Sequence, residues 1–148
     1  MRSVSTWLAK YGESHLNPVN KMLHWICVPV IVWCVIGFLW LIPNPGVNWA
    51  ILTVLVAVIY YTRLSIRLAL GALPVFLAMV WSVEWLSRPG TSLRIGLCLA
   101  PFILAWIGQF IGHVLEGKRP SFFEDVQFLL IGPRWLLANL YRRLGLRY

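Results

Sequence analysis

The residues of this chain best suited to chemistry are its histidines. The 148-residue sequence contains three of them, His15, His24 and His113. Neutral imidazoles brought to one place can bind a divalent metal ion and leave coordination positions open for water, substrate or oxygen. Iron, zinc and manganese all accept imidazole, so these ligands alone do not select the metal. Whether the histidines act together depends on the elements that position them.

The composition is that of a membrane protein. Hydrophobic residues make up 59% of the chain, charged residues make up 12%, and the mean hydropathy is +0.74. An ordinary soluble domain carries about twice that share of charge. Nine Trp are also present, and Trp is enriched where a membrane meets water. We therefore predict one integral membrane domain covering residues 1–148, in preference to a soluble helical domain.

Four apolar stretches predict four transmembrane helices, at about 18–42, 47–62, 68–86 and 93–116. Each approaches the roughly 20 residues that cross a bilayer core. The tail at 121–146 mixes Trp and Leu with Arg, which is typical of a helix in the membrane interface or of a helix packed on the bundle. The predicted fold class is all-α: an integral membrane bundle of four transmembrane helices followed by a C-terminal interfacial helix.

The basic residues predict the orientation of the bundle. The net charge is +8, and Lys and Arg concentrate near the N-terminus, around 63–67 and in the C-terminal tail. Basic proteins often bind nucleic acid, but charges that flank apolar segments follow the positive-inside rule, so we expect no nucleic-acid partner. Both termini are expected in the cytoplasm. The short loops favour a multi-pass protein of a bacterial inner membrane over one of the endoplasmic reticulum. All three histidines then fall at the cytoplasmic face.

The first predicted helix has a well-defined start. Asn17 is a good N-cap residue, and Pro18 occupies the first helical position, where its missing N–H costs nothing. Capping is the simplest role for Asn17. Asn20 lies four residues before His24 and therefore on the same face of the helix. From that position Asn20 could orient the imidazole ring.

The end of the fourth predicted helix carries a polar face. Gln109, His113 and Glu116 recur there at spacings of three or four residues. Polar groups at membrane depth are costly and are usually functional. Gly108 and Gly112 form a small-residue pair that would let a neighbouring helix approach closely. We expect this face to meet another helix and to contribute to a site.

The charged residues near the histidines have several open roles. Glu116 could pair with Lys118 or Arg119 at the membrane interface, act as a further metal ligand, or hold the tautomer of a ligating imidazole. Lys21, Lys118 and Arg119 could attract a substrate carboxylate. They are at least as well explained as anchors at the membrane surface.

Two segments resemble a known family. HLNPVNKMLHWICVP at 15–29 and QFIGHVLEGKRPS at 109–121 are similar to the motifs of the membrane 2-hydroxy-fatty-acid dioxygenases. That group is found in bacteria and fungi, and its fungal members act in phytosphingosine breakdown by fatty-acid alpha-oxidation. Cys27 stands where the family often has Gly, and Ser121 where Ala is common; neither is a candidate ligand. The resemblance implies an Fe(II)-dependent enzyme with His15, His24 and His113 as the metal ligands.

The resemblance also implies the reaction. The family shortens a 2-hydroxy fatty acid by one carbon and releases carbon dioxide. This oxidation yields four electrons, which reduce one O2 fully, so the stoichiometry requires no other co-substrate. The acyl chain would stay among the helices in the lipid bilayer. We expect catalytic roles for the three histidines and Glu116, and supporting or substrate-binding roles for Asn17, Asn20, Lys21, Gln109, Glu116, Lys118 and Arg119.

Two other functions remain open from the residues alone. His24 and His113 could be the axial ligands of a haem in a membrane electron carrier, which leaves His15 without a role. A non-catalytic membrane assembly protein would use only its surfaces, and its function would survive replacement of every histidine. The sequence does not fix the oligomeric state and is compatible with a homodimer.

Overall fold

The computed structural model describes residues 17–44, 46–86 and 91–117 of the chain. Within these ranges every regular element is an α-helix, and no strand occurs. The helices are α2 (Pro18–Leu41), α3 (Trp49–Leu64), α4 (Ile66–Leu86) and α5 (Thr91–Leu115). The prediction of an all-helical protein is confirmed for this part of the chain. The predicted interfacial tail at 121–146 lies outside the described residues.

Local sequence explains where α2 and α3 begin. The Asn17 side chain accepts a hydrogen bond of 2.8 Å from the N–H of Val19, and Pro18 follows at the first helical position. Asn48 caps α3 in the same way through the N–H of Ala50, also at 2.8 Å. Each cap satisfies one of the backbone donors that a helix start leaves without an intrahelical partner.

The connection between α3 and α4 is shorter than the sequence indicates. A loop was expected around residues 63–67, but only Ser65 separates the two helices. Arg63 lies inside α3 and Arg67 inside α4. A long basic side chain can extend from a helix end towards water while its stem remains on an apolar surface. The arginines therefore mark the ends of the apolar segments without breaking the helices.

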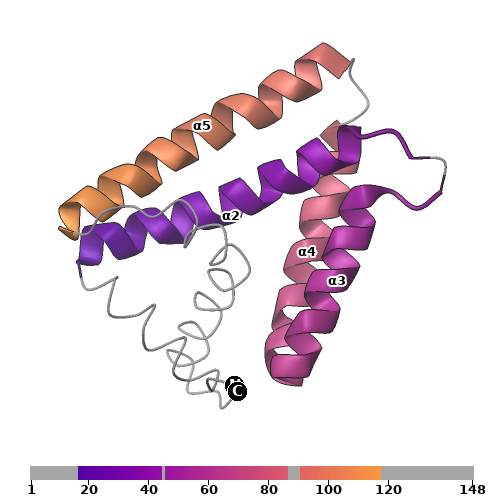
Figure 1. Cartoon of the computed structure of the whole chain (residues 1–148), viewed down its shortest axis with the longest axis horizontal. Helices are drawn as coiled ribbons and strands as arrows, with labels where there is room; N and C mark the ends of the chain where they lie inside the picture. The colour runs from indigo at the N-terminus through magenta and orange to yellow at the C-terminus, as the bar shows by residue number, and fades with distance from the viewer. Residues whose placement is uncertain (1–16, 45, 87–90, 118–148) are drawn as a thin grey trace.

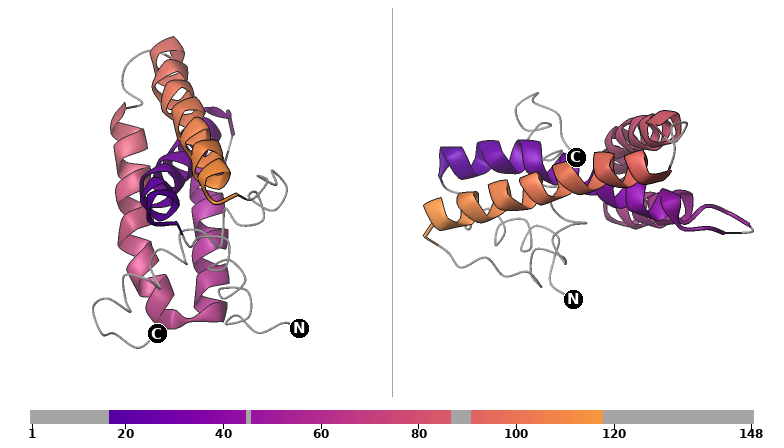
Figure 2. Two further views of the ribbon diagram at one scale, coloured as in Figure 1. Left: turned by 90° about the vertical axis from the view of Figure 1, so that its left-hand side faces the viewer. Right: turned by 90° about the horizontal axis from the view of Figure 1, so that it is seen from above.

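The four helices form two pairs (Figure 1). α2 and α5 lie side by side along much of their length, and α3 and α4 form the second pair. The second pair meets α2 towards the C-terminal end of α2, as the views from the side and from above also show (Figure 2). The start of α2 and the end of α5 therefore lie together at the end of the molecule away from α3 and α4.

Apolar packing and one hydrogen bond join α3 and α4 to each other and to α2. Tyr61 and Phe76 stack between α3 and α4 with ring centroids 6.1 Å apart, and Ile36 of α2 packs into the same cluster. Trp33 Nε1 donates a hydrogen bond of 2.8 Å to Ser82 Oγ, which joins α2 to α4. In membranes such close packing and interhelical hydrogen bonds replace the hydrophobic effect as the source of helix association. This packing holds α2 in place, and α2 carries half of the candidate site.

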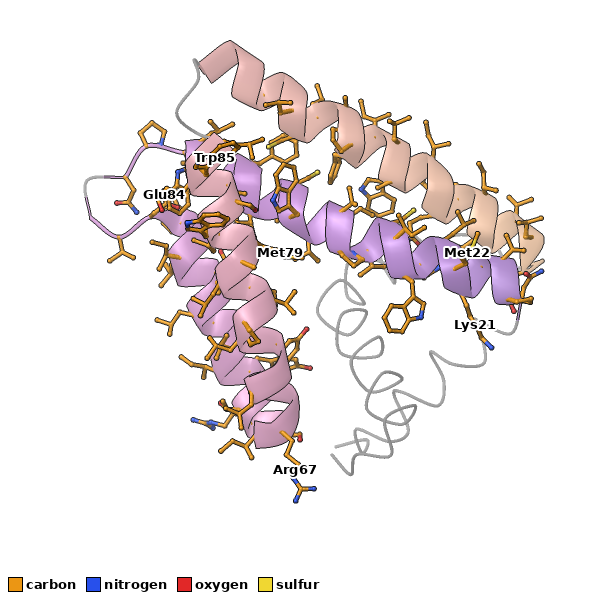
Figure 3. All side chains as sticks on the ribbon, turned by 180° about the vertical axis from the view of Figure 1, so that it is seen from behind. Lys21, Met22, Arg67, Met79, Glu84 and Trp85 are labelled. Carbon is orange, nitrogen blue, oxygen red and sulfur yellow. The ribbon has the colours of Figure 1, made fainter. Side chains whose placement is uncertain are left out.

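Three of the helices contain segments long and apolar enough to cross a membrane: Pro18–Leu41, Ala69–Leu86 and Ile95–Leu115. Large apolar side chains also face outwards, including Trp81 at 69% and Val114 at 70% exposure, and they cover the outer surfaces of the helices in Figure 3. Such a surface suits lipid. α3 has 16 residues and spans about 24 Å, less than the roughly 30 Å of a bilayer core. The chain is a membrane protein, and a fourth crossing by α3 stays a prediction.

Candidate functional site

The buried polar side chains of the described residues gather at one place. They are Asn20 and His24 on α2, and Gln109 and His113 on α5, each with 6% exposure or less. Both pairs belong to the ends of α2 and α5 that lie together in Figure 1. Burying polar groups in an apolar setting costs free energy unless they are paired, and in membrane segments such groups usually serve a function. This cluster is therefore the candidate site.

His24 and His113 face one another across the two helices. Their ring centroids are 5.3 Å apart, and the rings meet edge to face at an interplanar angle of 82°. An imidazole nitrogen that binds zinc lies about 2.0–2.1 Å from the metal, so two rings at this separation are near enough to share one ion. Folding thus brings together two histidines that are far apart in the sequence.

The tautomer of His24 follows from its hydrogen bond. His24 Nδ1 lies 3.0 Å from the main-chain oxygen of Asn20. A carbonyl oxygen can only accept, so Nδ1 must carry the proton and donate it. In the neutral ring Nε2 is then the nitrogen that carries the lone pair. A bond from one ring nitrogen to a backbone carbonyl is the usual support of a metal-ligating histidine. The main-chain carbonyl of Asn20 thus orients the ring, and a role for the Asn20 side chain in orienting it stays a prediction.

The side chain of Asn20 has a different partner, Glu116. Asn20 Nδ2 donates a hydrogen bond of 2.9 Å to Glu116 Oε2. The same carboxylate accepts from the backbone N–H of Asn17, at 3.0 Å to Oε2 and 3.3 Å to Oε1. We call Asn17, Asn20 and Glu116 the polar clamp. A carboxylate at a helix N-terminus also interacts favourably with the helix dipole. The clamp ties the start of α2 to the end of α5.

The end of α5 is shaped to present Glu116. Asn17 Nδ2 donates to the Leu115 oxygen at 3.4 Å, which satisfies one of the carbonyls left without a partner at the helix end. Gly117 follows with φ of 71°, the left-handed conformation in which glycine commonly ends a helix. The chain therefore leaves the helix directly after Glu116.

Two glycines let α2 and α5 approach closely. A Cβ atom placed on Gly112 would overlap Asn20 Oδ1. One placed on Gly108 would lie 2.7 Å from Cys27 Sγ, closer than real Cβ atoms come to other heavy atoms. The Gly108–Gly112 pair was predicted to receive a neighbouring helix, and that helix is α2. The separation of the two imidazoles depends on this contact.

The described residues do not by themselves provide three metal ligands. Among them, no group of three His, Cys, Asp or Glu side chains is placed to hold a metal ion. Glu116 therefore does not complete a set with His24 and His113, and its carboxylate is engaged with α2. His15, the third expected ligand, lies outside the described residues, as do Lys118 and Arg119. The three-histidine site stays a prediction.

The remaining candidate residues lie near the cluster. Lys21 extends from α2 away from its contact with α5 (Figure 3), so it is not part of the buried group. Gln109 is 5% exposed and lies one turn before His113 on α5. The contact of Gly112 with Asn20 was not assigned from the sequence. The small residue itself was the only available signal, because its partner depends on the tertiary packing.

The fold and the site together define a helical membrane protein with a buried pair of imidazoles where two helices meet. The profile of the family described as "2-hydroxy-palmitic acid dioxygenase Mpo1-like" matches residues 1–144, and the chain belongs to this family. It is also 28% identical over 143 residues to the 2-hydroxy-palmitic acid dioxygenase MPO1 of Saccharomyces cerevisiae, covering 93% of this chain and 79% of that protein. No solved structure matches the chain. The predicted family is confirmed, and it supports a role as a 2-hydroxy fatty acid dioxygenase.

Proposed function

We propose that this protein is an iron(II)-dependent dioxygenase that converts a 2-hydroxy fatty acid into the fatty acid one carbon shorter and carbon dioxide. The observation that carries the proposal is the buried pair of His24 and His113, with ring centroids 5.3 Å apart. The name of the yeast relative supports the substrate class. His15 is proposed as the third ligand from its place in the first sequence motif.

The chemistry of the donor set fits ferrous iron. Both described imidazoles are buried, and the hydrogen bond at Nδ1 makes Nε2 the lone-pair nitrogen of the neutral His24 ring. Nitrogen ligands of this type suit iron, and a site of few protein ligands retains open positions. When bound, the ion would supply adjacent positions for the 2-hydroxy acid and for O2. Manganese and zinc satisfy the same ligands, so the metal is part of what must be tested.

The protein contributes positioning and the exclusion of water. The Asn20 carbonyl holds the His24 ring, and the polar clamp fixes α2 against α5. Large apolar side chains surround the helices, so the acyl chain can remain in hydrocarbon while its head group reaches the polar cluster. We propose that Lys21 attracts the carboxylate to the membrane surface. Lys118 and Arg119, which lie outside the described residues, are proposed to have the same role. By the positive-inside rule, we propose that this face lies on the cytoplasmic side. We also propose that the membrane is a bacterial inner membrane.

The overall reaction balances without a further reductant. A 2-hydroxy acid and one O2 give the shortened acid, one carbon dioxide and one water. The substrate loses four electrons, and the O2 gains four. A 2-oxoacid co-substrate is therefore not needed.

The decisive experiment measures this stoichiometry. Purified protein is loaded with Fe(II) without oxygen, mixed with 2-hydroxypalmitate and then exposed to O2. We expect pentadecanoate and carbon dioxide in equal amounts, with one O2 consumed for each. Protein loaded with Zn(II) is the matched control and should be inactive. Equal product from the zinc form, or a requirement for an added 2-oxoacid, contradicts the proposal.

The packing of α2 on α5 argues against a haem between His24 and His113. A porphyrin ligated by both rings would have to lie between the two helices. At that contact a single Cβ atom on Gly112 would already overlap Asn20. We therefore expect no Soret band from the purified protein.

Replacement of His24 and His113 by Ala should abolish product formation, whereas a non-catalytic assembly protein would keep its function.

A further inference from the structure

Gln109 is a buried donor that the clamp and the imidazole pair do not use. Its side chain is 5% exposed. Its Nε2 atom is buried and makes no hydrogen bond within the part of the chain that the structure describes. Nearly all buried polar atoms in proteins have a partner, and an exception calls for an explanation. Among the described residues, Gln109 is therefore a candidate for a group that binds a ligand.

The position of Gln109 points to the imidazole pair. It precedes His113 by four residues on α5, and residues with this spacing lie next to each other on a helix surface, about 5–6 Å apart between Cβ atoms. Both side chains are buried, and His113 faces His24. When a small molecule binds at the imidazole pair, the atoms adjacent to its bound group would therefore lie within reach of the Gln109 amide.

The chemistry of the donor suggests which atoms it meets. The buried polar side chains of the described residues include no Lys or Arg. A neutral amide is less costly to bury than a cation when the site is empty. A carboxylate whose charge is balanced by a metal ion needs no second cation, but its outer oxygen still needs a hydrogen-bond donor. The Gln109 amide provides that donor without adding net charge.

We propose that Gln109 Nε2 donates a hydrogen bond to the carboxylate of the substrate and so selects 2-hydroxy acids over neutral amphiphiles with the same chain. The inference rests on the proposed function, because it takes the head group to lie at His24 and His113. Gln109 acts in binding and positioning. Removal of the donor weakens the complex with the acid and leaves the metal site in place.

The test compares two ligands on two proteins. One ligand is 2-hydroxypalmitate, and the other is the diol of the same length, in which a primary alcohol replaces the carboxylate. Binding to the iron-loaded protein in nanodiscs is measured without oxygen, for the natural protein and for Gln109→Leu. We expect Gln109→Leu to raise the Kd for the acid roughly tenfold to a hundredfold, the range of a hydrogen bond to a charged group. The Kd for the diol should change by less than about threefold, and the iron content should not change.

Two further variants keep the test decisive. Gln109→Glu has the same size, so it serves if the Leu variant does not fold, and its charge should weaken binding of the acid at least as much. Val114→Ala changes an exposed position of the same helix and should alter neither Kd. Equal losses for acid and diol, or no loss for the acid, overturn the inference.

The outcomes separate this inference from the proposed function. Turnover of 2-hydroxypalmitate by the natural protein, combined with unchanged binding by Gln109→Leu, overturns the role of Gln109 and leaves the dioxygenase proposal standing. Failure of the natural protein to bind or convert the acid overturns both.

Discussion

The carboxylate of Glu116 lies 3.0 Å from the backbone nitrogen of Asn17, although 99 positions separate the two residues in the chain. This contact joins the two segments that carry the family resemblance, one at the start of α2 and the other at the end of α5. It also places a negative charge at the positive end of the α2 dipole. The ends of the two helices that carry His24 and His113 are thus fixed by one acidic side chain.

Removing the Glu116 carboxylate should loosen the helix pair. Glu116→Ala deletes the acceptor for Asn17 and Asn20 and leaves a buried amide without it. We expect a loss of roughly 2–4 kcal/mol of unfolding free energy, because hydrogen bonds to charged groups contribute about 1.5–3 kcal/mol each and are not fully additive. The affinity for iron should fall roughly tenfold or more, as for other groups that support metal ligands. Unfolding in mixed micelles and iron titration measure the two effects.

Glu84→Ala is the matched control for this change. Glu84 is an exposed residue of α4, away from the polar cluster, and exposed charges contribute about 0–1 kcal/mol. Its iron affinity should equal that of the natural protein. A Glu84→Ala effect as large as that of Glu116→Ala would refute the clamp.

Gly112→Ala tests the close approach of α2 and α5. The added methyl group would overlap Asn20 Oδ1, so either the Asn20 side chain or the whole of α2 must shift. Overpacking of this kind costs about 1–3 kcal/mol, and we expect weaker iron binding because the two imidazoles move apart. Gly96→Ala on the same helix provides the control, since nothing lies within 4 Å of the new Cβ atom. That variant should be neutral or more stable, because Ala favours helix over Gly by about 1 kcal/mol.

The imidazole pair itself is tested by metal content. His24→Ala and His113→Ala should each lose stoichiometric iron after anaerobic loading, with folding retained as judged by circular dichroism. Asn20→Ala should retain more iron than either of them. It removes the side chain bound to Glu116 but keeps the main-chain carbonyl that orients His24. Iron loss in Asn20→Ala equal to that in His24→Ala would contradict the role assigned to the carbonyl.

Much of the helical framework follows from local sequence. Asn17 and Pro18 predict the start of α2, and the structure begins the helix at Pro18 with the Asn17 cap in place. The end of α3 and the start of α4 were harder to predict. Arg63 and Arg67 have the residue type expected in a loop, although both lie within helices. A charge at the end of an apolar segment indicates the membrane edge, and it carries little information about whether the backbone stays helical.

The site could be predicted only in part, for a reason that is physical. Residue types and helical spacing placed Gln109, His113 and Glu116 on one face, and they placed Asn20 beside His24. The partners across the interface depend on which helices pack together. The Glu116 bond to the Asn17 backbone was therefore not foreseen, since a main-chain donor leaves no mark in residue type. The same holds for the contact of Gly112 with Asn20.

Asn17→Asp gives the sharpest test of the clamp, because the usual preference predicts the opposite result. Asp is as good an N-cap residue as Asn and interacts well with a helix N-terminus, so an isolated helix would be unchanged or more stable. Here the new carboxylate would lie beside Glu116, whose oxygen already bonds the Asn17 nitrogen, and it could no longer donate to the Leu115 oxygen. We expect a loss of about 1–3 kcal/mol, measured by unfolding in mixed micelles. In a double-mutant cycle, Glu116→Gln should remove most of the penalty, because only one charge then remains at the contact. Additive effects of the two substitutions would show that the side chain at position 17 and Glu116 do not interact, which would contradict this part of the clamp.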